Sequence, residues 1–117
     1  MSLKNVYFIL VRPQIGENIG SVARAIKNFN ITKLRIVNPR CRWPNEKALV
    51  TSVGAKDILK SIKIYNTLEK SVGDLNVVFA TSSRIRKMNK RIISINDLKK
   101  KINSKYKIGI VFGPEAS

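Results

Sequence analysis

The chain has 117 residues, a length that favours one domain with one hydrophobic core. Its 23 lysines and arginines exceed its 7 acidic residues, and the net charge of +16 points to a polyanionic partner such as RNA or DNA. The alternative is that an AT-rich genome raises the content of lysine, isoleucine and asparagine, in which case the charge carries no function.

The composition also excludes several classes of function. Cys41 has no second cysteine to pair with, and without histidine neither a metal site nor a Ser-His-Asp or Cys-His catalytic design is expected. No apolar run approaches the roughly 20 residues of a membrane-spanning helix. The first residues lack the apolar core of a signal peptide. We therefore expect a cytoplasmic protein that binds neither metal nor membrane.

Strand-like and helical segments alternate from the start of the chain. Residues 5–11 are almost all apolar, as in a strand covered on both faces of a parallel sheet. Residues 17–30 have a helical repeat, so one face should pack on the sheet and the other should meet solvent or a partner. The face expected to pack carries Ile19, Val22, Ala23, Ile26 and Phe29.

The same alternation continues along the rest of the chain. The other expected strands are residues 33–37, 63–65, 77–80 and 108–112. The other expected helices are residues 45–54 capped by Asn45, residues 57–62, residues 67–72 capped at Thr67, and a basic helix through Leu98 and Ile102 capped by Ser94 or Asn96. This order predicts one α/β domain with a mostly parallel sheet and helices on both faces. Since such sheets bind ligands at the carboxyl ends of their strands, the candidate loops are residues 12–16, 38–44, 81–91 and 113–117.

The first loop has glycines before a helix but does not match a dinucleotide-binding turn. Residues 11–20, VRPQIGENIG, lack the G-x-G-x-x-G spacing, and Glu17 would repel a pyrophosphate. Asn18, Gly20 and Arg24 instead have the spacing N-x-G-x-x-x-R. Arg24 lies one turn beyond Gly20, whose small size leaves space, and with Asn18 it could form a pocket for a planar or phosphate anion. Asn18 could equally be a helix N-cap, and Gly20 could serve only close packing of the helix on a strand.

Hydroxyl groups and cations follow the strand at residues 77–80. Thr81, Ser82 and Ser83 offer polar groups to a ligand, although a plain turn would look the same. Five cations follow within eight residues, and such a run either binds RNA phosphates or is only a solvated loop. The cations expected to contact RNA are Arg12, Arg24, Arg84, Arg86, Lys87, Lys90 and Arg91.

Gly113, Pro114 and Glu115 follow the last expected strand. They could be an ordinary strand end. Alternatively, Glu115 could anchor a helix amino terminus or hold an arginine of a partner through a charge-assisted hydrogen bond. This segment does not decide between these readings by itself.

Taken together, the motifs resemble a known family over nearly the whole chain. In order they are Asn18, Gly20 and Arg24; the strand and Asn-Pro step at residues 34–39; Ser52-Val53-Gly54-Ala55; Thr81-Ser82-Ser83-Arg84; and Phe112, Gly113 and Glu115. They resemble the SpoU, or SPOUT, class of trefoil-knotted RNA ribose methyltransferases, and most of all its tRNA 2′-O-methyltransferase J branch. The last motif breaks off at Ser117 and the family's Ser-Leu-Asn turn is absent, so we expect a chain that lacks its carboxyl-terminal knot.

The resemblance implies methyl transfer from S-adenosylmethionine to a ribose 2′-hydroxyl of RNA, with nucleotide 32 of the tRNA anticodon loop as the expected target. Arg24 would act on the ribose and its phosphate, positioned by Asn18 and Glu115 and often supplied by the second subunit of a homodimer. The residues that would bind the cofactor are Thr81, Ser82, Ser83 and Gly113.

The expected chemistry needs few groups, because the sulfur becomes neutral when the methyl group leaves and in-line positioning can carry much of the catalysis. A guanidinium resists deprotonation, so we expect Arg24 to stabilise the developing alkoxide rather than to act as a general base. Two alternatives remain at this point. One is a non-catalytic RNA-binding module on the same scaffold, and the other is an rRNA 2′-O-methyltransferase.

Overall fold

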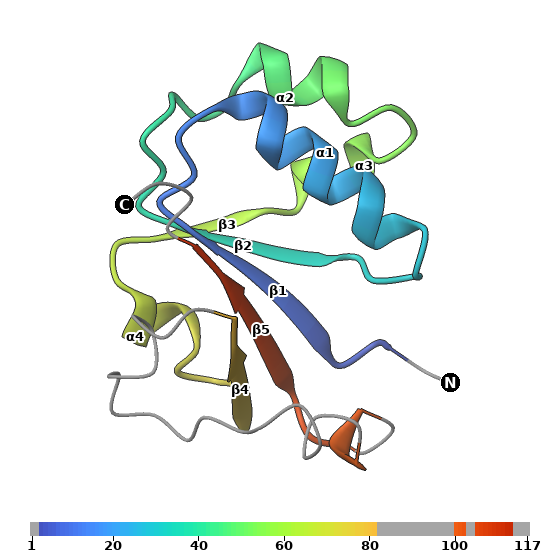
Figure 1. Ribbon diagram of the computed structural model, residues 1–117, viewed down its shortest axis with the longest axis vertical. Helices are drawn as coiled ribbons and strands as arrows, with labels where there is room; N and C mark the ends of the chain where they lie inside the picture. Colours follow the sequence, from blue (N-terminus) through green and yellow to red (C-terminus); the bar gives the residue numbers. More distant parts are fainter. Residues whose placement is uncertain (1–2, 82–99, 103–104, 114–117) are drawn as a thin grey trace.

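The computed structural model describes residues 3–81, 100–102 and 105–113, which form a five-stranded sheet with helices on both faces (Figure 1). The strands are β1 (Val6–Val11), β2 (Lys33–Val37), β3 (Lys63–Tyr65), β4 (Val77–Ala80) and β5 (Ile108–Phe112). The helices are α1 (Gly16–Lys27), α2 (Glu46–Thr51), α3 (Lys56–Lys60) and α4 (Leu68–Ser71). All neighbouring strands are parallel, which confirms the predicted α/β class. Among the described residues, no helix has the length and apolar character needed to cross a membrane.

The strand order in the sheet is β3-β2-β1-β5-β4. The chain moves outward from β1 to β2 and β3, and then returns to the other side of β1 for β4 and β5. In open parallel sheets, ligands bind beyond the carboxyl ends of the strands where the order reverses. Here the reversal lies between β1 and β5, whose register pairs Leu10 with Phe112. The ligand-binding edge is therefore expected beyond Val11 and Phe112.

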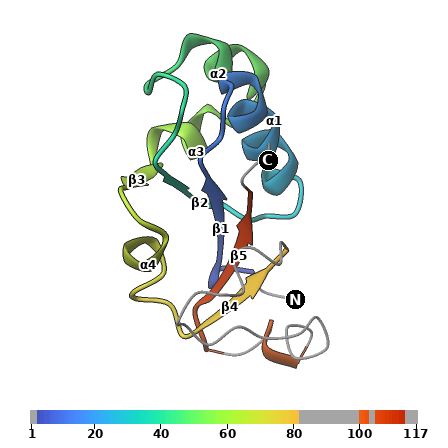
Figure 2. The same ribbon diagram turned by 60° about the vertical axis from the view of Figure 1, so that its left-hand side comes forward.

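Strand β1 is buried on both faces, which explains its nearly continuous apolar sequence. Val6 and Leu10 belong to the core beneath α1, α2 and α3. Ile9 belongs to a second core with Val72 of the α4 segment and Val111 of β5. Figures 1 and 2 show the same division, with α1 to α3 on one face of the sheet and α4 on the other. Removing apolar surface from water on both faces stabilises the sheet by about 25 cal/mol for each Å².

Helix α1 ends earlier than its apolar pattern predicted. It stops at Lys27, and Phe29 is 68% exposed instead of packed on the sheet. The chain turns here because Asn30 takes a left-handed conformation, with a φ of 61°. Lys27 then joins α1 to the region of α3, since its ammonium lies 2.9 Å from the Asp57 carboxylate and 2.6 Å from the Gly54 carbonyl oxygen. The hydrogen bond from Lys27 lowers the pKa of Asp57.

Helices α2 and α4 begin at caps that the sequence predicts. The side-chain oxygen of Asn45 accepts a hydrogen bond from the amide of Ala48 at 3.1 Å. The hydroxyl oxygen of Thr67 accepts one from the amide of Lys70 at 3.2 Å. Each cap satisfies one of the amides that lack a partner in the first turn of a helix.

A buried arginine joins β2 to the segment after α4. Arg35 is 7% exposed, and its guanidinium donates to both carboxylate oxygens of Asp74, at 2.7 and 2.9 Å. It also donates to the carbonyl oxygen of Ser71 at 2.7 Å. The rings of Tyr7 and Tyr65 have their centroids 4.4 and 5.6 Å from its Cζ atom. These partners offset the cost of burying a charge.

The stability of the fold should depend on this pair at acid pH. The hydrogen bond from Arg35 lowers the pKa of Asp74 to about 2. A carboxyl group with a lowered folded pKa stabilises the fold above its unfolded value of about 4, and that contribution is lost as the pH falls toward 2. Because the Asp74 side chain is half exposed, we expect a loss of only about 1 kcal/mol. Urea unfolding at pH 5 and at pH 2 measures the fall in the free energy of unfolding between the two pH values. This fall should be larger in the native chain than in Asp74→Asn, and an equal fall in both would contradict the prediction.

Candidate active site

Three of the predicted site residues lie together at the carboxyl edge of the sheet. Arg12 directly follows β1, and its amide donates to the carbonyl oxygen of Val37 at 2.7 Å. Thr81 directly follows β4, and its amide and hydroxyl both donate to the carbonyl oxygen of Val111, at 3.1 and 2.9 Å. Gly113 directly follows β5. Backbone hydrogen bonds therefore continue for one residue past the ends of β1 and β4.

Gly113 occupies a position that only glycine accepts without strain. Its φ is +113°, and a Cβ atom would lie 2.5 Å from the carbonyl oxygen of Val11. Other residues avoid both the conformation and the contact. Glycine therefore lets the end of β5 lie close against Val11 of β1, with the exposed Thr81 on the next strand.

An open cleft of about 840 Å³ adjoins the carboxyl edge, between the loops after β1 and β2 and the first turns of α1 and α2. We call it the edge cleft. The two loops are joined by a hydrogen bond from the amide of Arg40 to the carbonyl oxygen of Pro13 at 2.9 Å. The polar side chains that line the edge cleft are Gln14, Glu17, Cys41, Arg42, Asn45, Glu46 and Lys47. The described residues contain no group of three or more cysteine or acidic side chains placed to hold a metal ion.

Sequence reasoning found part of this cleft and missed the rest. The loops at residues 12–16 and 38–44 were predicted to face a ligand, and both contribute to its walls. The start of α2 was not included, because no local pattern indicates that α2 begins beside α1. The basic residues Arg40, Arg42 and Lys47 in one short segment were the available signal.

Gly20 serves helix packing and does not open a ligand pocket. It is buried where α1 meets α2, and a Cβ atom there would overlap the carbonyl oxygen of Ala48 and the hydroxyl of Thr51. The Thr51 hydroxyl also hydrogen-bonds the carbonyl oxygen of Glu17 on α1 at 3.2 Å. The space that we expected above Gly20 is therefore filled by α2. The alternative reading of a packing glycine is correct, although the partner is a helix and not a strand.

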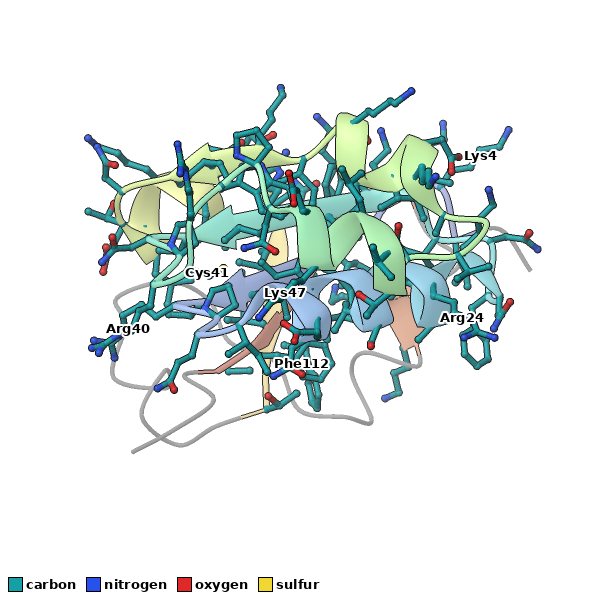
Figure 3. The ribbon with its side chains drawn as sticks, turned by 90° about the horizontal axis from the view of Figure 1, so that it is seen from above. Lys4, Arg24, Arg40, Cys41, Lys47 and Phe112 are labelled. Carbon is teal, nitrogen blue, oxygen red and sulfur yellow. The ribbon has the colours of Figure 1, made fainter. Side chains whose placement is uncertain are left out.

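Asn18 and Arg24 are both exposed on α1, but they do not form one pocket. The helix begins at Gly16 with Ile15 in the N-cap position, so the reading of Asn18 as the cap is wrong. Arg24 is six positions after Asn18 in the helix, which places it about 9 Å further along the axis and about 120° around it. Figure 3 shows Arg24 on the opposite side of the view from Arg40, which follows β2 near the carboxyl edge. Since α1 runs back from that edge, one chain does not bring Arg24 beside Thr81 and Gly113.

Eight of the predicted site residues lie outside the described part of the chain. They are Ser82, Ser83, Arg84, Arg86, Lys87, Lys90, Arg91 and Glu115. Most of the basic helix expected through Leu98 lies outside it as well. Their roles stay predictions, as does the trefoil knot.

The family of the chain follows from comparison with known proteins. The sequence profile described as the SpoU rRNA Methylase family matches residues 5–117. The chain belongs to the SpoU methylase family. This result confirms the resemblance that the motif around Asn18, Gly20 and Arg24 indicated.

Among the relatives of this SpoU chain is a curated protein of Methanocaldococcus jannaschii named tRNA (cytidine-2′-O-)-methyltransferase TrmJ. It is 41% identical over 111 residues, which cover 92% of the chain and 48% of that protein. The chain spans about half the length of the curated relatives that it matches.

Solved structures of SpoU relatives have the same fold. A probable methylase family protein from Haemophilus influenzae superposes with a TM-score of 0.81 at 33% identity, over 98% of the chain and 48% of that structure. TrmJ from Z. mobilis superposes with a TM-score of 0.78 at 40% identity, over 93% of the chain and 49% of that structure. The chain therefore corresponds to about half of each of these two solved proteins.

Proposed function

We propose that this protein transfers a methyl group from S-adenosylmethionine to a ribose 2′-hydroxyl of tRNA, as a homodimer in the cytoplasm. The proposed target is nucleotide 32 of the anticodon loop. The observation that carries the proposal is the family match over residues 5–117, together with relatives named as tRNA 2′-O-methyltransferases. The net charge of +16 supports an RNA substrate, because each phosphate that a cation neutralises adds to the affinity.

The carboxyl edge has features that fit the nucleoside of the cofactor. Gly113 carries no side chain that would cover this edge, and its close approach to Val11 fixes the end of β5 beside β1. The hydroxyl of Thr81 donates to Val111, and its oxygen can accept a further hydrogen bond. When bound, S-adenosylmethionine supplies a methyl group on a positive sulfur, which becomes neutral as the methyl group leaves. Gly113 and Thr81 would hold the nucleoside, and no acid is needed at this edge to protonate a leaving group.

Arg24 is the residue that we propose for the RNA side of the reaction. Within the described part of the chain, its side chain makes no hydrogen bond or ion pair. A guanidinium stays protonated, so it can bind a phosphate and stabilise the negative charge that develops on the 2′-oxygen as the hydroxyl proton passes to solvent water. Since Arg24 and Gly113 lie apart in one chain, we propose that Arg24 acts at the carboxyl edge of the second subunit, where Asn18 and Glu115 of that subunit position it.

The proposal is tested with the protein extended to the length of its relatives. Incubated with methyl-labelled S-adenosylmethionine, it should transfer the label to tRNA, and the labelled nucleotide should resist alkaline cleavage because its 2′-oxygen is blocked. Ribosomal RNA is tested in parallel, since the family description names rRNA. In calorimetry, the 117-residue chain alone should bind S-adenosylmethionine very weakly.

The outcomes separate the candidate functions. RNA binding without methyl transfer would contradict the enzyme and favour a non-catalytic RNA-binding module. Label in ribosomal RNA alone would contradict tRNA as the substrate, and label at another tRNA position would contradict nucleotide 32. Tight binding of the cofactor by the 117-residue chain would show that the carboxyl edge suffices for the cofactor site.

A further inference from the structure

A second, smaller cavity lies beside the edge cleft, between the loop after β2 and the helices α2 and α3. Its volume is about 290 Å³. Trp43 and Pro44 form its wall on the loop side, and Leu49 and Ile62 contribute aliphatic side chains from the helix side. We call this cavity the Trp43 slot. It lies at the lower end of the size range of ligand pockets, so it fits one ring system and not a whole nucleotide cofactor.

The slot offers apolar surface and few free polar groups. Trp43 and Ile62 are partly buried and pack on the core beneath α1 to α3. Asn45 also lines the slot, but its amide already accepts from the backbone of Ala48 and donates to the carbonyl oxygen of Arg42, both at 3.1 Å. A ligand would therefore be held by contact with its face and not by hydrogen bonds that read its edge. Such a site suits a planar ring and discriminates little between rings.

The rim of the slot is cationic. Lys60 is exposed and lines the slot itself, and Arg42 and Lys47 are exposed and line the edge cleft together with the carboxylates Glu17 and Glu46. The two cavities are adjacent, since Pro44, Asn45 and Leu49 line both. Arg40 is exposed on the same loop (Figure 3). With Arg40, four cations stand against two carboxylates around this apolar surface. An apolar surface with an excess of cations matches a polyanion that carries aromatic rings, and single-stranded RNA has this chemistry.

We propose that the Trp43 slot stacks one unpaired base of the RNA substrate while the surrounding cations bind its backbone. This inference rests on the proposed function, because it assigns an additional contact to the same RNA. It adds Trp43 as an RNA-binding residue on the loop after β2, apart from Arg24 on α1. The contact tolerates any base, so it contributes affinity and register rather than sequence selection.

The test uses the fluorescence of Trp43, which is the only tryptophan in the 117-residue chain. A single-stranded RNA octamer of mixed sequence should quench this fluorescence saturably, because a stacked base contacts the indole ring. Inorganic polyphosphate should compete with the RNA for the cations without quenching. In anisotropy titrations with labelled octamer, Trp43→Leu should weaken binding about tenfold or more, the effect of losing one stacked base. Trp43→Phe keeps an aromatic ring and should retain most of the affinity.

A matched control and the alternative outcomes make the test decisive. Phe29→Leu removes an exposed aromatic ring outside the slot and should leave RNA affinity unchanged. Unquenched fluorescence on RNA binding, or equal affinity in Trp43→Leu, would contradict base stacking in the Trp43 slot. Neither result would bear on methyl transfer to tRNA, which is measured separately. Fluorescence that changes with protein concentration alone would mean that a second copy of the chain covers the slot, and this result would also contradict base stacking. If the extended protein neither binds RNA nor transfers methyl groups, the proposed function fails and the slot fails with it.

Discussion

Replacing Arg24 with alanine should lower methyl transfer to tRNA by at least about a hundredfold, the usual cost of removing a group that stabilises developing negative charge. The fold should be unaffected, because Arg24 is exposed and has no hydrogen bond or ion pair in the described part of the chain. Affinity for S-adenosylmethionine should also stay nearly unchanged, since Thr81 and Gly113 are the residues proposed to hold it. Initial rates of label transfer, calorimetry and thermal unfolding measure the three quantities.

The control for Arg24→Ala is Lys70→Ala. Lys70 is an exposed cation of α4 on the opposite face of the sheet, so its loss removes the same charge without touching the proposed site. Strong residual methyl transfer in Arg24→Ala would remove Arg24 from the mechanism.

A second experiment tests whether Arg24 acts across subunits. Mixing Arg24→Ala with Gly113→Ala should restore part of the activity if each site combines residues of two chains. Absence of any recovery, with mixed dimers demonstrated, would contradict an Arg24 that acts across subunits.

The second large effect should come from Gly20→Ala, which we expect to lower the free energy of unfolding by about 2 kcal/mol. The new Cβ atom would overlap the carbonyl oxygen of Ala48, which is backbone and moves only if α2 is displaced. Forcing extra volume into packed structure costs about 1 to 3 kcal/mol and sometimes more. Alanine returns about 1 kcal/mol through its higher helix propensity. Urea unfolding monitored by circular dichroism measures the net loss.

Two variants distinguish this packing effect from a general effect of alanine. In Gly73→Ala the new Cβ atom would lie 3.6 Å from the nearest carbonyl oxygen, an ordinary contact, so stability should be unchanged or slightly higher. Adding Thr51→Ala to Gly20→Ala removes one of the two overlaps and should recover only part of the loss, because the Ala48 carbonyl oxygen remains. Native stability in Gly20→Ala would show that α1 and α2 do not rely on close contact at this glycine.

The local elements were predictable because their causes are local. Both faces of strand β1 are covered, so nearly all of its residues are apolar. This apolar run predicts a buried strand even when the elements that cover it are not known. Asn45 and Thr67 cap helices through amides three residues away, so the spacing alone is sufficient. The same logic fails at Phe29, where helical spacing continues but the left-handed Asn30 has already turned the chain.

The site was predictable only as far as it follows strand ends. Arg12, Thr81 and Gly113 lie at the same edge because parallel strands place their carboxyl ends together. This rule can be applied from the pattern of strands in the sequence, without coordinates. Gly20 was assigned the wrong neighbour, because its partner α2 lies in another part of the sequence.

Residue patterns alone were enough to predict the α/β class, the family motifs and the strongly cationic character of the chain. The tertiary structure alone decided the strand order, the burial of Arg35 against Asp74, the position of Arg24 away from Gly113, and the Trp43 slot. The difference lies in how far apart along the sequence the interacting residues are. Hydrophobic periodicity and caps act over a few residues, whereas Arg35 and Asp74 are 39 residues apart and meet only after the sheet has formed.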